Sequence, residues 1–428
     1  MSQAAKHASP RQVALALMAG VLDEGRLLSD LVATPMVTEL APGDRARAAR
    51  LATETLRTLD RADRLLKPLL RKEPPLMVQN ILRLGVVEIC GNGEAAHGVV
   101  NDLVGIAGAS NRTQPYKGMV NAVLRRAGEA GEGKWGKMPV PRLPKWLRQP
   151  LMAAYGNSAM QGIEAAHLRG APLDLSVKPG VDAAALAEAT AGVVLPTGSV
   201  RIAGTPQVSA LPGFDAGDWW VQDAAAALPA QLLNAQPGEV VADFCAAPGG
   251  KTMQLAAAGA QVTAVDSHGG RLERVHENLT RVGLSAEVIE ADVLRLGGSF
   301  DAILLDAPCS ATGTIRRHPD LPYARDGHGI SELIALQAQM IDAALAQLNP
   351  GGRMVFCTCS LLPDEGEVQV EEALARHPGV TTDRAVLERP GIDPAWITEE
   401  GGLRLRPDYW SEQGGMDGFY MALLHKPA

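Results

Sequence analysis

The feature that most constrains this chain of 428 residues is an alternation of apolar strand-like runs and helix-like runs in its second half. Five runs have the character of buried strands: EVVADFC, QVTAVD, AEVIEAD, FDAILLDAP and GRMVFCTCS. The runs between them, such as GRLERVHENLTRVG and SELIALQAQMIDAALAQL, have apolar residues at helical spacing. Strands joined through helices predict a parallel sheet covered on both faces. We therefore expect residues 216–428 to form an α/β domain.

The first part of the chain lacks this alternation. Residues 1–130 hold short apolar stripes at helical spacing, separated by Gly, Pro or Asn, and are expected to form an all-helical domain. The run GEAGEGKWGKMPVPRLP, residues 128–144, has the composition of a linker. Residues 145–215 then predict a small mixed α/β segment. Because the first thirty residues carry acids within a helical pattern, they do not predict a signal peptide, and we expect a cytoplasmic protein.

Charge differs sharply along the chain. Residues 1–150 hold 22 Lys and Arg against 14 Asp and Glu, whereas residues 151–428 hold 18 against 34. A basic module attached to an acidic one favours a polyanionic partner for the first part. No apolar run reaches membrane-spanning length, so no membrane partner is expected. The five cysteines do not form the pattern of a disulfide framework.

A glycine-rich turn predicts a ligand site at one edge of the sheet. DFCAAPGGKT, Asp243 to Thr252, follows the first strand and opens a helix. A phosphate-binding P-loop would need glycine where Cys245 stands, and no G-x-G-x-x-G is present. Asp266, Asp292 and Asp306 end the next three strands, where an open α/β sheet binds ligands. Acids suited to ribose and adenine, without a phosphate site, indicate S-adenosylmethionine.

Two cysteine motifs follow the fourth and fifth strands, DAPCSATG and FCTCS. A zinc site would need four ligands, and the C-x-C of Cys357 and Cys359 has no nearby histidine pair, so no metal is expected. A disulfide within C-x-C is strained. Cys357 is expected in the core or wall, which leaves Cys359 as the exposed thiol beside the cofactor crevice, with Cys309 on the neighbouring motif.

A thiolate beside this cofactor suggests methylation at carbon 5 of a pyrimidine. That carbon is a poor nucleophile until a thiolate adds to carbon 6 and makes it enamine-like. Asp306 is placed to share a proton with cytosine N3. Cys309 could assist release of the product. The residues alone do not decide which cysteine attacks, since DNA cytosine enzymes use the Pro-Cys position.

The motifs DFCAAPGGKT, DAPCSATGT and TCS resemble the NOL/NOP/Sun family of RNA cytosine-C5 methyltransferases. The stretch from IRRHPDLPYARDG to AQLNPGG resembles the bacterial branch that acts on small-subunit (16S) ribosomal RNA. HGVVNDLVGIAGAS and KGMVNAVLRR in residues 1–130 resemble its NusB-like RNA-binding domain. The resemblance implies a Rossmann-like methyltransferase domain after the helical domain and the small α/β segment.

The resemblance also implies roles for single residues. Cys359 is the expected nucleophile, Cys309 the residue that helps product release, and Asp306 a catalytic acid. The expected S-adenosylmethionine contacts are Cys245, Ala246, Ala247, Pro248, Gly249, Gly250, Lys251, Asp266, Asp292 and Asp306. Ala311 stands where the family often has glycine, and LSVKP, residues 175–179, lacks the common Arg-Val-Asn.

The expected activity is therefore methylation of cytosine carbon 5 in 16S ribosomal RNA by a monomer. The target base must leave its stack to reach the crevice. Arg125 and Arg126 are expected to hold phosphates. Two alternatives stay open: a transfer RNA substrate, and an RNA-binding assembly factor with a silent methyltransferase fold.

Overall fold

The computed structural model describes residues 8–204 and 206–428. The chain divides into two compact units, Met1–Arg169 with Ile315–Gly327, and Gly170–Thr314 with His328–Ala428. Residues 1–7 of the expected helical domain and residue 205 of the expected α/β segment lie outside the described residues. The observed division differs from the expected boundaries, and residues 170–215 belong to the same unit as residues 216–314. Residues 145–169 and residues 315–327 both belong to the first, helical unit.

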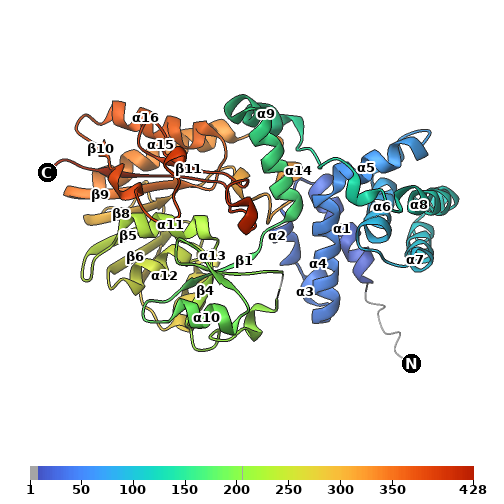
Figure 1. Ribbon diagram of the computed structural model, residues 1–428, viewed down its shortest axis with the longest axis horizontal. Helices are drawn as coiled ribbons and strands as arrows, with labels where there is room; N and C mark the ends of the chain where they lie inside the picture. Colours follow the sequence, from blue (N-terminus) through green and yellow to red (C-terminus); the bar gives the residue numbers. More distant parts are fainter. Residues whose placement is uncertain (1–7, 205) are drawn as a thin grey trace. The chain divides into compact units, whose positions relative to one another are not determined.

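The helical unit contains the expected helices around one apolar core. Helix α1 begins with a capping box, in which Gln12 Oε1 accepts a hydrogen bond from Ser9 N at 2.8 Å. Leu17, Leu56 and Leu82 are fully buried at its centre. The helices are α1 (Pro10–Leu22), α2 (Leu28–Val32), α3 (Pro35–Thr38), α4 (Pro42–Arg57), α5 (Leu59–Leu66), α6 (Leu76–Val86), α7 (Ala96–Gly108), α8 (Lys117–Gly131), α9 (Lys145–Arg169) and α14 (Leu321–Ala324) (Figure 1).

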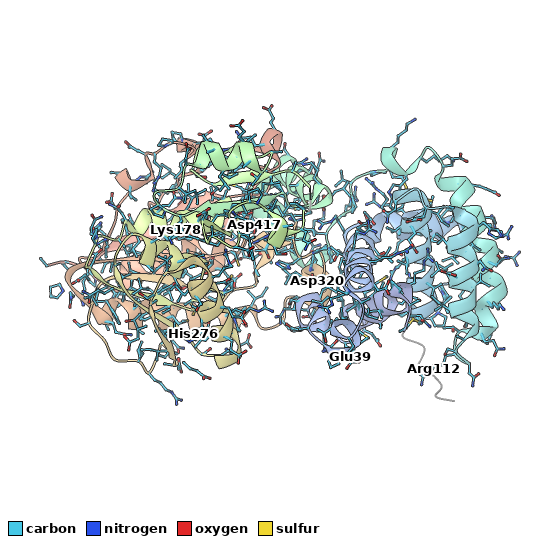
Figure 2. The ribbon with its side chains drawn as sticks, turned by 90° about the horizontal axis from the view of Figure 1, so that it is seen from below. Glu39, Arg112, Lys178, His276, Asp320 and Asp417 are labelled. Carbon is cyan, nitrogen blue, oxygen red and sulfur yellow. The ribbon has the colours of Figure 1, made fainter. Side chains whose placement is uncertain are left out.

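Residues 315–327 are held in the helical unit by polar contacts to distant parts of the sequence. Asp320 Oδ2 accepts a hydrogen bond from Leu28 N at 2.8 Å (Asp320 is labelled in Figure 2). Trp146 Nε1 donates to the carbonyl of Pro322 at 2.9 Å. These contacts join residues 176 or more positions apart. Local sequence patterns therefore could not assign this segment to the first unit.

The second unit begins with a small antiparallel sheet. Its strands have the order β2-β3-β1-β4. At the end of β1, Lys178 Nζ donates to the carbonyl of Val282 at 2.6 Å, so the lysine of LSVKP makes a contact within the unit. The elements are β1 (Leu173–Val177), α10 (Ala183–Ala189), β2 (Val193–Val194), β3 (Val200–Ile202) and β4 (Trp219–Val221).

A larger sheet forms the body of the second unit, with the strand order β10-β12-β9-β8-β5-β6-β7. Strands β9, β8, β5, β6 and β7 are parallel, as the alternation predicts. A further strand, which the alternation did not include, extends the sheet at one edge, where β12 pairs with β9 in the antiparallel direction. The strands are β5 (Val240–Phe244), β6 (Gln261–Asp266), β7 (Glu287–Glu290), β8 (Phe300–Asp306), β9 (Leu348–Thr358), β10 (Thr381–Thr382), β11 (Leu403–Leu405) and β12 (Phe419–His425).

Helices cover both faces of this sheet (Figure 1). On one face, α11 (Ala224–Leu233) and α12 (Gly250–Ala257) pack on Leu304 and Val355. On the other face, α15 (Ile330–Gln347) and α16 (Glu367–Arg376) pack on the alternate strand residues Leu305 and Phe356. α13 (Gly269–Val282) contacts β6 and β7. Burial on both faces explains the continuous apolar strands. The carboxyl ends of the parallel strands meet at one edge, where the predicted motifs lie.

Candidate active site

The turns after β8 and β9 bring two cysteines together. The Sγ atoms of Cys309 and Cys359 lie 3.5 Å apart. The strands are in register at this edge, with Asp306 opposite Cys357, and Ala307 N donates to the carbonyl of Cys357 at 3.0 Å. The two predicted motifs therefore form one site.

Gly313 lets the Cys309 turn approach its neighbours closely. Its amide donates to the carbonyl of Cys359 at 2.9 Å, and its own carbonyl accepts from Gly418 N at 2.8 Å. A Cβ atom at position 313 would lie 1.9 Å from Gly418 O and 2.8 Å from Cys359 O. Because both neighbours are backbone, only glycine fits here. This contact also places the MDGF segment beside the cysteines.

Cys357 is part of the core, as expected. Its side chain is fully buried, and its Sγ lies 3.5 Å from Asp306 Oδ1. Burial raises the pKa of the Cys357 thiol well above its ordinary value, and the Asp306 carboxylate adds to that rise. A neutral, inaccessible thiol is not a nucleophile. The hydrogen bond with Cys359, together with burial, likewise raises the pKa of Cys309.

Asp306 is held by a lysine in an ion pair. Lys251 Nζ lies 2.7 Å from Asp306 Oδ2. Burial lowers the pKa of Lys251, but the carboxylates of Asp306 and Asp243 outweigh burial, and the pKa lies above its ordinary value. The predicted cofactor residue Lys251 is therefore a permanent cation that holds Asp306 in place. Figure 2 shows the side chains of this unit from below.

The glycine-rich turn lies beside Asp266. Asp266 Oδ2 accepts a hydrogen bond from Ala247 N at 3.2 Å, and Ala246 N donates to the carbonyl of Val265 at 3.0 Å. Cys245 has a φ of +63° and Gly249 a φ of +101°, so both turn residues have left-handed backbone. Burial raises the pKa of the Cys245 thiol, so this side chain lines the turn as a neutral group. The turn leads through Pro248 and Gly250 into α12, whose N-cap Gly249 makes no side-chain cap hydrogen bond.

Asp292 lies in a more open place than Asp266 and Asp306. Its side chain is 50% exposed, and its Oδ1 accepts a hydrogen bond from Leu294 N at 3.0 Å. It follows Ala291, whose amide donates to the carbonyl of Asp266 at 3.1 Å. The backbone thus brings residue 292 next to the end of β6. Its contact with the adenine stays a prediction.

The residues at this edge fit S-adenosylmethionine. Because the N-cap residue of α12 is Gly249, no N-cap side chain occupies the amide groups that open this helix, which suits a carboxylate. Asp243 Oδ2 accepts from Thr252 Oγ1, whereas its Oδ1 has no hydrogen-bond partner within the described ranges. Burial raises the pKa of Asp243 to about 7. A buried acceptor of this kind suits the donor groups of an aminoacyl ligand.

Two buried acids of the site were not among the predicted functional residues. Asp243 is the first residue of the motif DFCAAPGGKT and lies in β5. The sequence does not show that one of its carboxylate oxygens lacks a hydrogen-bond partner. Glu365 is fully buried and bonds to residues of both cysteine turns. In the sequence it is one of five acids in PDEGEVQVEE, and spacing does not distinguish it from its neighbours.

A Rossmann-like sheet with this cofactor edge and a paired thiol site defines an S-adenosylmethionine-dependent methyltransferase. Residues 230–425 match the family described as 16S rRNA methyltransferase RsmB/F, and residues 8–129 match the NusB family. The chain belongs to the 16S rRNA methyltransferase RsmB/F family.

Full-length relatives support this assignment. The chain is 36% identical to ribosomal RNA small subunit methyltransferase B of Pseudomonas syringae pv. tomato, over 98% of this chain and 97% of the relative. It is 38% identical to the protein of that name from Sodalis glossinidius, over 98% of each chain. The crystal structure of PH0851 is similar in fold, with a TM-score of 0.74 and 23% identity over 98% of this chain and 99% of that one.

Proposed function

We propose that this chain methylates carbon 5 of a cytosine in 16S ribosomal RNA, with Cys359 bonded transiently to carbon 6. One observation carries the proposal: two thiols lie 3.5 Å apart at the carboxyl edge of the sheet, the edge at which β8 ends with Asp306. Methyl transfer to an amine nitrogen needs no such pair, because the nitrogen lone pair attacks directly. Methyl transfer to carbon 5 needs a nucleophile that first activates the ring.

Cys359 supplies that nucleophile. Its sulfur adds to carbon 6 from above the ring plane, and the proton that leaves the thiol ends on N3 of the base. The S–C6 bond leaves carbon 5 electron-rich. S-adenosylmethionine, when bound, supplies the methyl group that carbon 5 takes.

Asp306 stabilises the adduct. As a carboxylate paired with Lys251, it accepts a hydrogen bond from the protonated N3 of the base. The lysine keeps the carboxyl oxygen in a fixed position, so little reorganisation is needed when the ring charge develops. Asp306 is a catalytic residue in this account.

Cys309 assists release. After methylation, Cys309 as a thiolate takes the proton from carbon 5, so that the electron pair re-forms the ring double bond and expels the Cys359 sulfur, which takes back the proton from N3. The Cys309 Sγ lies 3.5 Å from that sulfur, within reach of the same ring. Each step then has a group of this chain at the reacting atom.

The substrate is tested by methyl incorporation. Labelled S-adenosylmethionine is supplied with the purified protein and separate pools of 16S ribosomal RNA and transfer RNA. Incorporation at carbon 5 of a cytosine in the ribosomal pool is expected. Incorporation into transfer RNA alone would support the first alternative, and no incorporation in either pool would support a silent assembly factor.

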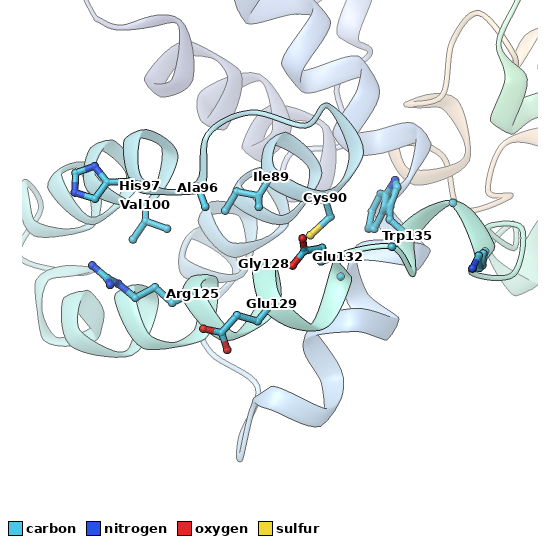
Figure 3. A pocket seen from close by; sticks show the side chains of 14 residues that line it. Ile89, Cys90, Ala96, His97, Val100, Arg125, Gly128, Glu129, Glu132 and Trp135 are labelled. Carbon is cyan, nitrogen blue, oxygen red and sulfur yellow. The ribbon is translucent and has the colours of Figure 1, made fainter.

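The helical unit is the proposed RNA-binding module. Arg125 and Arg126 are exposed on α8, and Arg125 lines a pocket of about 860 Å³ together with His97 and Trp135 (Figure 3). Exposed guanidinium groups near a concave surface suit RNA phosphates.

The cellular location is proposed from the expected substrate. Ribosomal RNA places the enzyme in the cytoplasm, and we expect it to act as a monomer. Among the described residues, no helix is long and apolar enough to cross a membrane.

A further inference from the structure

Glu365 connects the two turns that carry the cysteines. It lies in the 3-10 helix Pro363–Glu365, after β9, and its side chain is fully buried. Its Oε1 accepts a hydrogen bond from Ser310 N at 2.9 Å, and its Oε2 accepts one from Ser360 Oγ at 2.6 Å. Ser310 directly follows Cys309, and Ser360 directly follows Cys359. One carboxylate is therefore bonded to the residue after each cysteine.

All hydrogen-bond donors around this carboxylate belong to the same network. The Ser310 hydroxyl also donates to Glu365 Oε2. Gln337 Nε2 of α15 donates to Glu365 Oε1 at 3.1 Å and to the carbonyl of Pro308 at 2.8 Å. A carboxylate that accepts four hydrogen bonds can remain in the interior. The network fixes the Cys309 turn from both sides of the cysteine, at Pro308 and at Ser310.

Side-chain hydroxyl groups also join the same turns. Thr358 Oγ1 donates to the carbonyl of Glu365 at 2.7 Å, and Leu362 N donates to Ser360 Oγ at 3.0 Å. Thr312 Oγ1 lies 3.2 Å from Ser360 Oγ and accepts from Leu361 N at 2.9 Å. The turns that carry Cys309 and Cys359 are thus joined by a network of polar contacts with Glu365 at its centre.

We infer that Glu365 is a positioning residue for the two-cysteine reaction, which holds the Cys309 and Cys359 turns at the separation that adduct formation and release require. The inference rests on the proposed covalent mechanism. In the part of the chain that the structure describes, the Glu365 carboxylate bonds to Ser310, Ser360 and Gln337 and not to either sulfur, so it acts through Ser310 and Ser360. A displacement of about 1 Å between reacting groups can lower a rate about 100-fold.

The electrostatic environment agrees with this role. The hydrogen bond with Cys359 and burial raise the pKa of Cys309 most, and the negative charge of Glu365 adds to that rise. Glu365 is therefore close enough to the Cys309 thiol for its charge to act on it.

The first test separates positioning from folding. Glu365→Ala removes every bond of the carboxylate, whereas Glu365→Gln retains a planar group whose amide can donate to the two serine hydroxyls. For Glu365→Ala, kcat should fall about 100-fold, while KM for RNA and the Kd for S-adenosylmethionine change less than about threefold. Glu365→Gln should retain more than about one tenth of the wild-type kcat. Asp364→Asn, on the exposed preceding residue, is the matched control and should be unchanged.

The second test measures the separation of the sulfurs without any RNA. The oxidant diamide converts two adjacent thiols into a disulfide and is itself reduced to the hydrazine. Mass spectrometry follows formation of the Cys309–Cys359 bond. Wild-type protein should form it readily, and Glu365→Ala should form it at least about tenfold more slowly.

The outcomes are distinguishable. If Glu365→Ala reacts with diamide at the wild-type rate and retains its kcat, the positioning role is wrong. If Glu365→Ala unfolds, the same comparison is made with Ser310→Ala and Ser360→Ala, each of which removes one serine hydroxyl that donates to Glu365. Unchanged kcat and unchanged diamide rates in both variants would overturn the role. If diamide rates respond to Glu365 but Cys359→Ala is fully active, the proposed mechanism fails while the structural role of Glu365 stands.

Discussion

The Sγ atoms of Cys309 and Cys359 lie 3.5 Å apart although fifty residues separate them in the chain. Parallel strands β8 and β9 are adjacent and in register, so the residues that follow their ends arrive at the same edge. Gly313, Gly418 and the carbonyl of Cys359 then close the turn by backbone contact. In the proposed mechanism, both sulfurs act on the same base at this edge.

The first prediction concerns Cys309. Cys309→Ala should leave the attack step intact but slow release by about 100-fold or more, because proton removal from carbon 5 loses its assistance. A covalent protein–RNA species should accumulate, visible as a slowly migrating band on a denaturing gel. Cys90→Ala, which changes a partly buried cysteine of the helical unit, is the matched control and should accumulate none. If Cys309→Ala forms no adduct and Cys359→Ala traps one, the two roles are reversed.

The second prediction concerns Asp306. Asp306→Asn removes the charge that stabilises the protonated N3, and kcat should fall about 100-fold to 10,000-fold. Lys251 then loses its ion-pair partner, so a lower melting temperature is also expected. Steady-state rates and calorimetric S-adenosylmethionine binding check this. A kcat within a factor of three of wild type would show that Asp306 has no part in catalysis.

The third prediction concerns backbone strain at Ala311. Its φ is +56°, a left-handed conformation that costs an alanine about 1 kcal/mol. Ala311→Gly should therefore leave the free energy of unfolding unchanged or raise it by up to about 1 kcal/mol. Ala335→Gly, at an exposed position inside α15, should lower it by about 1 kcal/mol. Equal losses in the two variants, measured by urea unfolding, would contradict the assignment of strain.

The fourth prediction concerns pH and His167. The imidazole is buried, and neither ring nitrogen has a hydrogen-bond partner in the part of the chain that the structure describes. Burial lowers its pKa to about 3, with further lowering by Arg57 and Arg316. Because the unfolded state binds a proton near pH 6.5 and the folded state does not, stability is lost as pH falls below about 6.5. Between pH 7 and pH 5 the loss from this residue is about 2 kcal/mol.

His167→Leu should remove that part of the pH dependence. Melting temperatures of wild type and variant, measured from pH 8 to pH 5, should diverge as the solution becomes acidic, with the variant the more resistant. Parallel curves over that range would mean that His167 binds its proton equally in the folded and unfolded states, which contradicts the lowered pKa.

The fifth prediction concerns RNA affinity. Arg125→Ala and Arg126→Ala should each weaken 16S RNA binding and lower the dependence of log K on log salt by about one unit. Arg26→Ala is the control, since that guanidinium already lies 3.5 Å from Glu24. Filter binding at several salt concentrations provides the measurement. Unchanged slopes for both variants would exclude these two arginines from the phosphate contacts.

The local patterns of the sequence were sufficient for most elements of the second unit. Strand-like runs such as FDAILLDAP became β8, and DFCAAPGGKT became the turn between β5 and α12. Patterns of this kind depend on neighbours along the chain. The antiparallel pairing of β12 with β9 depends instead on which edge of the sheet is open, and the alternation of strands and helices did not predict it.

Long-range contacts also explain what the sequence could not assign. Residues 315–327 fold with the helical unit through Asp320 and Trp146, partners that lie far away in the chain. Glu365 is chemically like its neighbours Asp364 and Glu367, and only its burial and its two serine partners distinguish it. The sequence shows that alanine stands at position 311, where the family often has glycine, but it does not show that this residue has a left-handed backbone.

The most direct test of the covalent mechanism uses 16S RNA in which cytosine is replaced by 5-fluorocytosine. Fluorine at carbon 5 cannot leave as a proton does, so the methylated adduct cannot break down. With S-adenosylmethionine present, the account predicts a stable protein–RNA complex whose peptide map places the RNA on Cys359, and no complex with Cys359→Ala. Methylation of ordinary RNA by Cys359→Ala at the wild-type rate, or attachment of the RNA to another residue, would contradict it.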